Sequence, residues 1–304
     1  MTHSSEFRFL HEHAERVNRL APLPKVERKS VLAPSGRRVS ALVSNDPLAR
    51  GTEPVVFLHG AGLNAHTFDA TVLALEENTV SIDLPGHGRS DWRDDADYSP
   101  TTVAADVAAT IASLTSGDVH LVGQSLGGLT AAALIPLLHS RLRTVTLIDI
   151  TPGFDPARDA TDVSHFISGK RVFASYDEMV DRAIAFGLGS DRAALTREIA
   201  LNARERSDGR VEWSHHFAQL DGLDAAASGP EAQRPFEGLW QHLASLGARV
   251  TGVRGAAGLV TDQLQSEWRN RLPEAEMITL QGGHNVQEAV PAQLGFCIRK
   301  IVLA

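Results

Sequence analysis

Four short and almost uninterrupted runs of apolar residues constrain the fold of this chain more than any other feature. The runs lie at residues 55–58, 79–82, 119–122 and 145–148. Strands that are buried on both faces, such as the central strands of a parallel sheet, have this pattern. Between the runs, apolar residues recur at helical spacing, as in residues 99–114, which open on a Ser-Pro start signal. The alternation predicts an α/β fold with a mostly parallel central sheet flanked by helices.

A long interruption divides this pattern in two. The alternation stops after Ile150 and resumes at residues 248–253, where the next strand is expected. The residues between contain stretches with helical spacing and turn-rich breaks. We therefore expect one core formed by residues 1–150 and 247–304, with residues 151–246 as an insertion.

Smaller elements can also be assigned from the pattern. Residues 26–43 alternate around Pro34-Ser35-Gly36, which predicts a β-hairpin, and the residues before them predict a polar helix or a frayed arm. Helices are expected at 126–138, 177–185, 193–203 and 263–271, a last strand at 277–280, and a final helix from about Gln287.

Charge and cysteine content exclude several classes of protein. The formal net charge of -8 argues against a nucleic-acid binder, which needs a basic surface. The single cysteine, Cys297, allows no intramolecular disulfide and favours a cytoplasmic location. Residues 1–20 lack the apolar stretch of a signal peptide, and no run approaches the roughly 20 apolar residues of a membrane-spanning helix. We expect no export and no membrane insertion.

Ser125 lies at the centre of Gly123-Gln124-Ser125-Leu126-Gly127, between an expected strand and an expected helix. A serine hydroxyl is a poor nucleophile until a neighbouring base takes its proton, so its geometry must be fixed. Glycines two positions on either side allow a sharp strand-to-helix turn that exposes the hydroxyl. The segment therefore predicts a nucleophilic serine.

A second glycine-rich turn, His59-Gly60-Ala61-Gly62, follows the first apolar run. Its backbone amides can stabilise the negative oxygen of a tetrahedral intermediate. We expect the amides of Ala61 and Leu126 to form this oxyanion hole, with His59 orienting the loop. After the next run comes a loop, residues 83–90, in which we expect Asp83 and His87 to brace the structure.

With these three segments in this order, the sequence resembles the α/β-hydrolase superfamily over roughly residues 26–304. The resemblance implies that the insertion is a helical cap after the sixth strand. It also implies a general base on the loop that follows the last strand, which is Gln281 to Gln287 here. His284 is the histidine of that loop.

The acid that would orient His284 departs from the usual pattern. Most superfamily members carry it after the strand at 250–253, but Gly255 to Thr261 contains no carboxylate. Asp149 ends the strand at 145–148, and its distance along the chain from Ser125 resembles that of members whose acid lies there. Asp262 is the alternative, although capping of the next helix would explain it equally well. Asp149 is preferred, and both stay open.

Substrate recognition is expected from Gly60 and from aromatic residues of the insertion, above all Phe154, Phe166 and Trp213. Further aromatic residues of the insertion are Phe173, Tyr176, Phe186, Phe217 and Trp240. Each could instead pack in the core of the cap. His215-His216 lacks a third ligand in the sequence, so no metal and no cofactor is expected.

Hydrolysis by acyl transfer through Ser125, His284 and Asp149 is the leading hypothesis. A small, apolar carboxylic ester or lactone is the expected substrate, and a homodimer is compatible with the sequence. One alternative is cleavage of a carbon–carbon bond in a vinylogous diketone, as in the similar meta-cleavage product hydrolases, whose histidine-glycine loop is usually richer in Ser, Gly and Pro. Another is a receptor-like binding protein on the same scaffold. Haloalkane dehalogenases and epoxide hydrolases need an aspartate where Ser125 stands.

Overall fold

The sheet at the centre of the molecule has eight strands in the order β1-β2-β4-β3-β5-β6-β10-β11. The structure is a computed structural model that describes residues 6–49, 51–156, 170–186, 191–220 and 235–304. The strands are β1 (Val26–Leu32), β2 (Arg38–Ser44), β3 (Val55–Leu58), β4 (Thr79–Asp83), β5 (Val119–Gln124), β6 (Leu142–Ile148), β10 (Val250–Gly255) and β11 (Glu276–Leu280). From β4 to β11 all neighbours are parallel, while β1 and β2 form an antiparallel hairpin that pairs antiparallel with β4.

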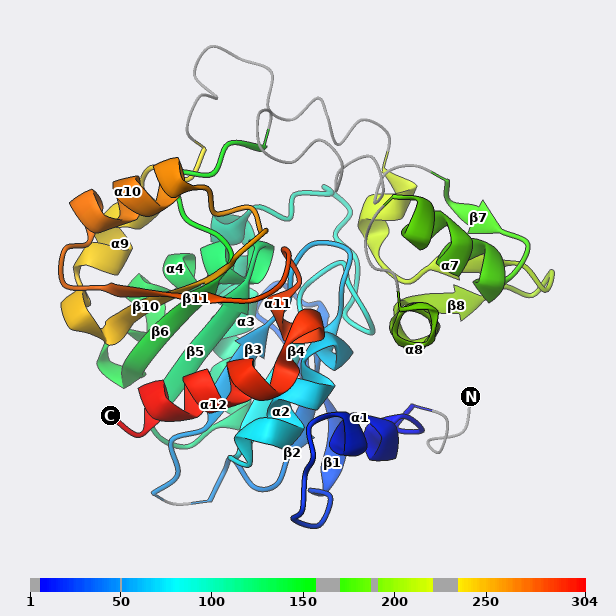
Figure 1. The fold of residues 1–304 in the computed structure, drawn as a ribbon, viewed down its shortest axis with the longest axis horizontal. Helices are drawn as coiled ribbons and strands as arrows, with labels where there is room; N and C mark the ends of the chain where they lie inside the picture. The colour runs from blue at the N-terminus through cyan, green and yellow to red at the C-terminus, as the bar shows by residue number, and fades with distance from the viewer. Residues whose placement is uncertain (1–5, 50, 157–169, 187–190, 221–234) are drawn as a thin grey trace.

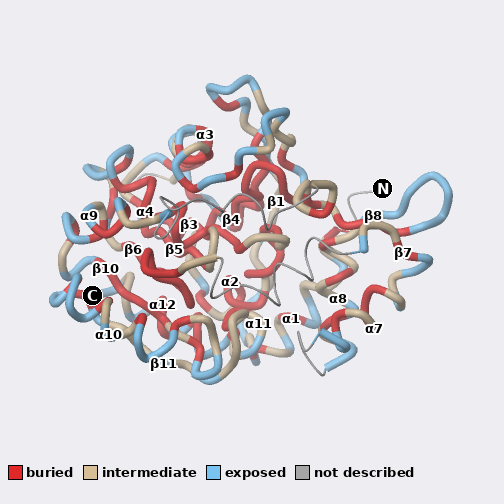
Figure 2. The backbone as a smooth tube through the Cα atoms, turned by 90° about the horizontal axis from the view of Figure 1, so that it is seen from above, coloured by how far each residue is buried: buried red, intermediate tan, exposed pale blue. Residues whose placement is uncertain are grey.

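The predicted strands are confirmed, and burial explains why their pattern was clear. Every residue of β3, β4 and β5 is buried, as the red central strands in Figure 2 show. A strand covered on both faces must be apolar at successive positions rather than at alternate ones. The hairpin is also confirmed, with Gly36 at a φ of 78° in its turn.

Helices cover both faces of the sheet (Figure 1). One face carries α2 (Asp69–Leu75), α11 (Val286–Ala289) and α12 (Pro291–Val302). The other carries α3 (Pro100–Leu114), α4 (Leu126–Leu138), α9 (Leu239–Ala244) and α10 (Asp262–Arg271). The short helix α1 (Leu10–Arg16) packs against α2. Pro100 opens α3 directly after Ser99, as its start signal predicts.

The chain leaves the core after β6 and forms a separate lobe beside α1 (Figures 1 and 2). Its described elements are β7 (Val172–Phe173), α7 (Tyr176–Ala185), α8 (Arg192–Asn202), β8 (Ala203–Glu205), β9 (Val211–Trp213) and the 3-10 turn η4 (His216–Gln219). The two predicted helices are present, and a small antiparallel sheet of order β7-β9-β8 accompanies them. Phe173, Met179, Ile199 and Trp213 contribute to a hydrophobic cluster of its own.

The end of the insertion belongs structurally to the core. Helix α9 packs on α4, and Trp240 and Leu243 lie in the hydrophobic cluster of the main sheet. The division at residue 246 remains a prediction. In the described ranges, no helix is both long enough and apolar enough to cross a membrane.

Candidate active site

Ser125 occupies a strained turn between β5 and α4. Its φ of 52° and ψ of -119° are rare for a residue with a side chain, and such strain is found most often at functional sites. The flanking glycines make the turn possible, because a Cβ on Gly123 would lie 2.2 Å from the carbonyl oxygen of Gly127. A Cβ on Gly127 would lie 2.0 Å from the carbonyl oxygen of Leu58. The turn leaves Ser125 partly exposed.

His284 and Asp149 meet at the same edge of the sheet. Nδ1 of His284 lies 2.9 Å from Oδ2 of Asp149, although 135 positions separate the two residues along the chain. Asp149 follows the end of β6 and is fully buried, with a φ of 49°. The loop after β10 surrounds its carboxylate with backbone donors: the amides of Gly255, Leu259 and Val260 lie 3.0, 2.6 and 3.4 Å from its oxygens. These donors hold the carboxylate in a fixed position.

Asp262, the alternative acid, lies at the start of α10, where its side chain is 94% exposed and pairs with Arg254 at 2.8 Å. It does not cap the helix as the sequence suggested. Thr261 does so, by accepting a hydrogen bond from the amide of Leu264. The structure thus brings Asp149, rather than Asp262, to His284.

The second ring nitrogen of His284 faces Gln124. Nε2 of His284 lies 3.1 Å from Nε2 of Gln124, and within the described ranges no hydrogen bond joins His284 to the hydroxyl of Ser125. In enzymes without substrate, catalytic hydrogen bonds are often long and tighten only when substrate is bound. No pattern in the sequence pointed to Gln124, because the position before a nucleophilic serine accepts many residue types.

The two expected oxyanion donors are free to bind a ligand. Considering bonds between described residues only, the amides of Ala61 and Leu126 donate to no acceptor. Leu126 begins α4, where the first amides have no partner inside the helix. Gly60 lies directly beside this site, since a Cβ there would be 3.2 Å from Cβ of Ser125 and 2.1 Å from Oε1 of Gln124. A larger residue at position 60 would therefore have to displace the side chain of Gln124.

Two buried histidines hold the loops around the site. Nε2 of His59 accepts a hydrogen bond from the amide of Leu84 at 2.9 Å, and Nε2 of His87 accepts one from Gly62 at 3.1 Å. Burial lowers the pKa of His59, and burial together with His59 and His215 holds the pKa of His87 well below its ordinary range. Both rings are therefore neutral and can accept these bonds.

Asp83, the last residue of β4, holds the loops that follow β3 and β4. Its carboxylate lies 2.6 Å from Nη1 of Arg28 and accepts hydrogen bonds from the amides of Ala65 and Arg89 at 2.8 and 3.0 Å. Burial alone would raise the pKa of Asp83, but Arg28 and the backbone donors hold it below its ordinary value. The bracing roles expected for Asp83 and His87 agree with these contacts.

The aromatic residues of the insertion lie mostly in packed interiors. Phe154 is 8% exposed within the main core, and Trp213 is 4% exposed beside Phe173, with the two ring centroids 5.9 Å apart. Phe166 lies outside the described residues. His216 stacks on Trp92 at 4.4 Å, whereas His215 faces His87.

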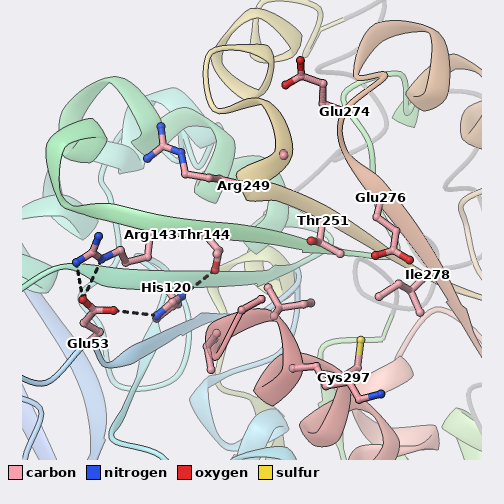
Figure 3. A pocket seen from close by; sticks show the side chains of 15 residues that line it. Glu53, His120, Arg143, Thr144, Arg249, Thr251, Glu274, Glu276, Ile278 and Cys297 are labelled. Atoms are coloured by element: carbon pink, nitrogen blue, oxygen red, sulfur yellow. Dashed lines mark hydrogen bonds and ion pairs between the residues drawn. The ribbon is translucent and has the colours of Figure 1, made fainter.

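A cavity of about 890 Å³ lies at the other end of the strands. Figure 3 shows its lining of mixed charge, including Arg143 at the start of β6, Glu276 at the start of β11, and Cys297. Ser125 follows the carboxyl end of β5, so this cavity is not the site described above. The described part of the chain contains no group of three or more His, Cys, Asp or Glu residues arranged to hold a metal ion.

The parallel sheet with a serine in the turn after β5 is the arrangement of an α/β hydrolase, and comparison with known proteins leads to the same family. The model of the alpha/beta hydrolase family matches residues 55–294. The chain belongs to this family.

Particular relatives can be named. The chain is 32% identical over 311 residues to the esterase Rv0045c of Mycobacterium tuberculosis, which covers 99% of this chain and 97% of the relative. A solved structure of that esterase superimposes with a TM-score of 0.83 over the whole of both chains, at 33% identity. The 3-hydroxybutyrate-oligomer hydrolase of Cupriavidus necator is 28% identical over 78% of this chain and 80% of its own length.

Proposed function

We propose that this protein hydrolyses a carboxylic ester, with Ser125 as nucleophile, His284 as general base and Asp149 as the acid that orients it. The observation that carries the proposal is the 2.9 Å contact between His284 and the buried Asp149, beside a serine held in a strained turn. The 32% identity to an esterase along nearly the whole chain supports ester hydrolysis.

In the first half of this reaction, Oγ of Ser125 attacks the carbonyl carbon while Nε2 of His284 takes its proton. The carboxylate of Asp149 accepts a hydrogen bond from the N–H at Nδ1 of His284 and stabilises the imidazolium that forms. The free amides of Ala61 and Leu126 hold the oxyanion, each contributing about 3 kcal/mol to its stabilisation. His284 then donates its proton to the departing alcohol, and the acyl group remains on Ser125.

In the second half, water takes the place of the serine hydroxyl. His284 removes a proton from the water, the oxygen attacks the acyl carbon, and the proton returns to Ser125 as the acid leaves. Every group in this scheme comes from the core, so the insertion is left to select the substrate. We propose a small-molecule ester or lactone as that substrate.

A fluorophosphonate probe tests the proposed nucleophile. We expect the wild-type protein to be labelled and Ser125→Ala to be unlabelled, with kcat on a p-nitrophenyl ester reduced by at least about 10⁴-fold. Ser113→Ala removes an exposed serine on α3 and provides the matched control, which should label and turn over as the wild type does.

A substrate panel separates the alternatives. Turnover of esters or lactones without turnover of a vinylogous diketone supports the proposal, and the opposite result indicates carbon–carbon bond hydrolysis. A folded wild-type protein that neither labels nor turns over any substrate contradicts catalysis and indicates a binding protein.

A further inference from the structure

Gln124 is the last residue of β5 and is fully buried, although its side chain carries an amide. Its Nε2 lies 3.1 Å from Nε2 of His284, 3.3 Å from the carbonyl oxygen of His284 and 3.4 Å from Oδ1 of Asn285. Its Oε1 is buried without a hydrogen-bond partner among the described residues. A buried amide that leaves one polar atom unsatisfied lowers stability, so what its Nε2 contacts decides whether the side chain serves the fold or the site.

The contact with His284 involves the nitrogen that matters for the proposed chemistry. Because Nδ1 of His284 faces the carboxylate of Asp149, Nδ1 carries the hydrogen in the neutral ring and Nε2 carries the lone pair. An amide N–H of Gln124 can therefore donate to Nε2. This is the same lone pair that must receive the proton of Ser125.

We propose that Gln124 is a positioning residue whose amide donates to Nε2 of neutral His284 before substrate binds and yields that nitrogen to Ser125 afterwards. The inference rests on the roles proposed for Ser125 and His284. The hydrogen bond from Gln124 has to break before Nε2 can take a proton, so this contact opposes protonation of the ring, whereas Asp149 favours it. In the described part of the chain, Asp149 is the ionisable side chain that contacts the ring.

Two substitutions test the contact in opposite ways. Gln124→Met keeps the length of the side chain and removes the donor. We therefore expect the acid limb of the pH profile of kcat/KM to move to higher pH by about half to one unit. Gln124→Glu replaces the donor with a carboxylate that favours the imidazolium, so we expect a larger shift in the same direction.

Gln287→Met is the matched control, because Gln287 is also a fully buried glutamine. Its Nε2 donates to Oγ1 of Thr67, 3.2 Å away, and its Oε1 has no partner among the residues that the structure describes. Its loss should lower the melting temperature and leave the acid limb unchanged. A structural role for Gln124 would give the same result in Gln124→Met, which would overturn the proposal.

Nuclear magnetic resonance of ¹⁵N-labelled histidines gives a readout that does not depend on turnover. The His284 resonances should titrate at higher pH in Gln124→Met than in the wild type, and equal titration overturns the proposal. If Gln124→Met does not fold, the isosteric Gln124→Glu provides the comparison. If the fluorophosphonate does not label the wild type, the proposed function itself is wrong. If it labels the wild type but Gln124→Met has the same acid limb as the wild type, only the role of Gln124 is wrong.

Discussion

Four groups donate hydrogen bonds to the carboxylate of Asp149: the ring of His284 and the amides of Gly255, Leu259 and Val260. A charge buried without such partners would be strongly destabilising. The amides of Gly255 and Val260 donate to Oδ1, and that of Leu259 donates to Oδ2, the oxygen that also faces His284. Together they fix the orientation of the carboxylate. They also explain how the loop after β10 can dispense with a carboxylate of its own.

Substitution of Asp149 tests this arrangement at the residue scale. In Asp149→Asn the new NH₂ group would face Nδ1 and favour the wrong tautomer of His284, so we expect kcat to fall by about 10³- to 10⁴-fold. Steady-state turnover of a p-nitrophenyl ester gives the measurement. Asp262→Asn, which alters only an exposed pair with Arg254, should retain wild-type turnover. A larger loss in Asp262→Asn than in Asp149→Asn would refute the assignment.

Some of these residues could be predicted from the sequence and others could not. Ser125 and His284 stand in recognisable turns, and Asp149 stands at the end of a recognisable strand. Gln124 gave no signal, because its contact depends on how closely the loop of His284 approaches β5. The amide donors to Asp149 could not be predicted either. Every residue other than proline has a backbone amide, and the sequence does not show the direction in which it points.

At the scale of elements, the loop of residues 255–260 is closely packed against Asp149. A Cβ on Gly258 would be 2.2 Å from Oδ2 of Asp149, and one on Gly255 would be 2.4 Å from the carbonyl oxygen of Gly283. Two glycines thus bring the loops of the acid and the histidine together. An added methyl group has to displace either the acid or the loop.

Gly258→Ala should therefore impair activity more than stability. We expect kcat/KM to fall by tenfold or more, because a small displacement of Asp149 misaligns His284, and the free energy of unfolding to fall by about 1–3 kcal/mol. Kinetics and urea unfolding would be measured on the same preparation. The control is Gly238→Ala at the start of α9, where a Cβ meets nothing within 4 Å. Equal effects of the two substitutions would contradict the close packing.

The longer strands and helices could be predicted from the sequence, but the short strands of the insertion could not. The central strands were evident because both faces are buried, and α7 and α8 because their spacing is helical. The sheet of β7, β8 and β9 was missed. Its strands have only two or three residues, too few to establish an alternating pattern.

At the scale of the whole molecule, a partly buried polar contact joins the insertion to the core. Glu198 of α8 is hydrogen-bonded to Glu288 of α11, which also accepts a hydrogen bond from Thr67 at 2.9 Å. Arg16 of α1 lies 3.6 Å from the Glu288 carboxylate. Burial, reinforced by Glu288, raises the pKa of Glu198 well above its ordinary value of 4.5, and burial raises the pKa of Glu288 as well. We therefore expect the folded pair to retain a proton that the unfolded chain would release.

This pair should make the stability of the protein depend on pH. The folded state holds the extra proton, so its stabilisation is complete below pH 4.5 and is lost as the pH rises through the raised pKa. We expect the melting temperature of the wild type to fall between pH 5 and 9, with a limit of about 1.4 kcal/mol per pH unit for one proton. Glu198→Gln, which cannot ionise, should flatten this dependence.

Glu205→Gln on β8 is the control, because Glu205 is exposed and its loss should leave the pH dependence as it is in the wild type. Thermal unfolding of the three proteins in the same buffers gives the comparison. Parallel curves for wild type and Glu198→Gln would show that the carboxyl pair does not bind a proton on folding.

The separation of Asp149 and His284 along the chain has a consequence for biosynthesis. The two residues touch across 135 positions, and the histidine arrives only after the insertion, β10 and β11 have been translated. In a growing chain, Ser125 is therefore synthesised well before the histidine that we propose as its base. Ser125 should therefore react with a fluorophosphonate only after β10 and β11 have docked on the sheet. The time course of labelling during refolding would then measure the rate of that last folding step.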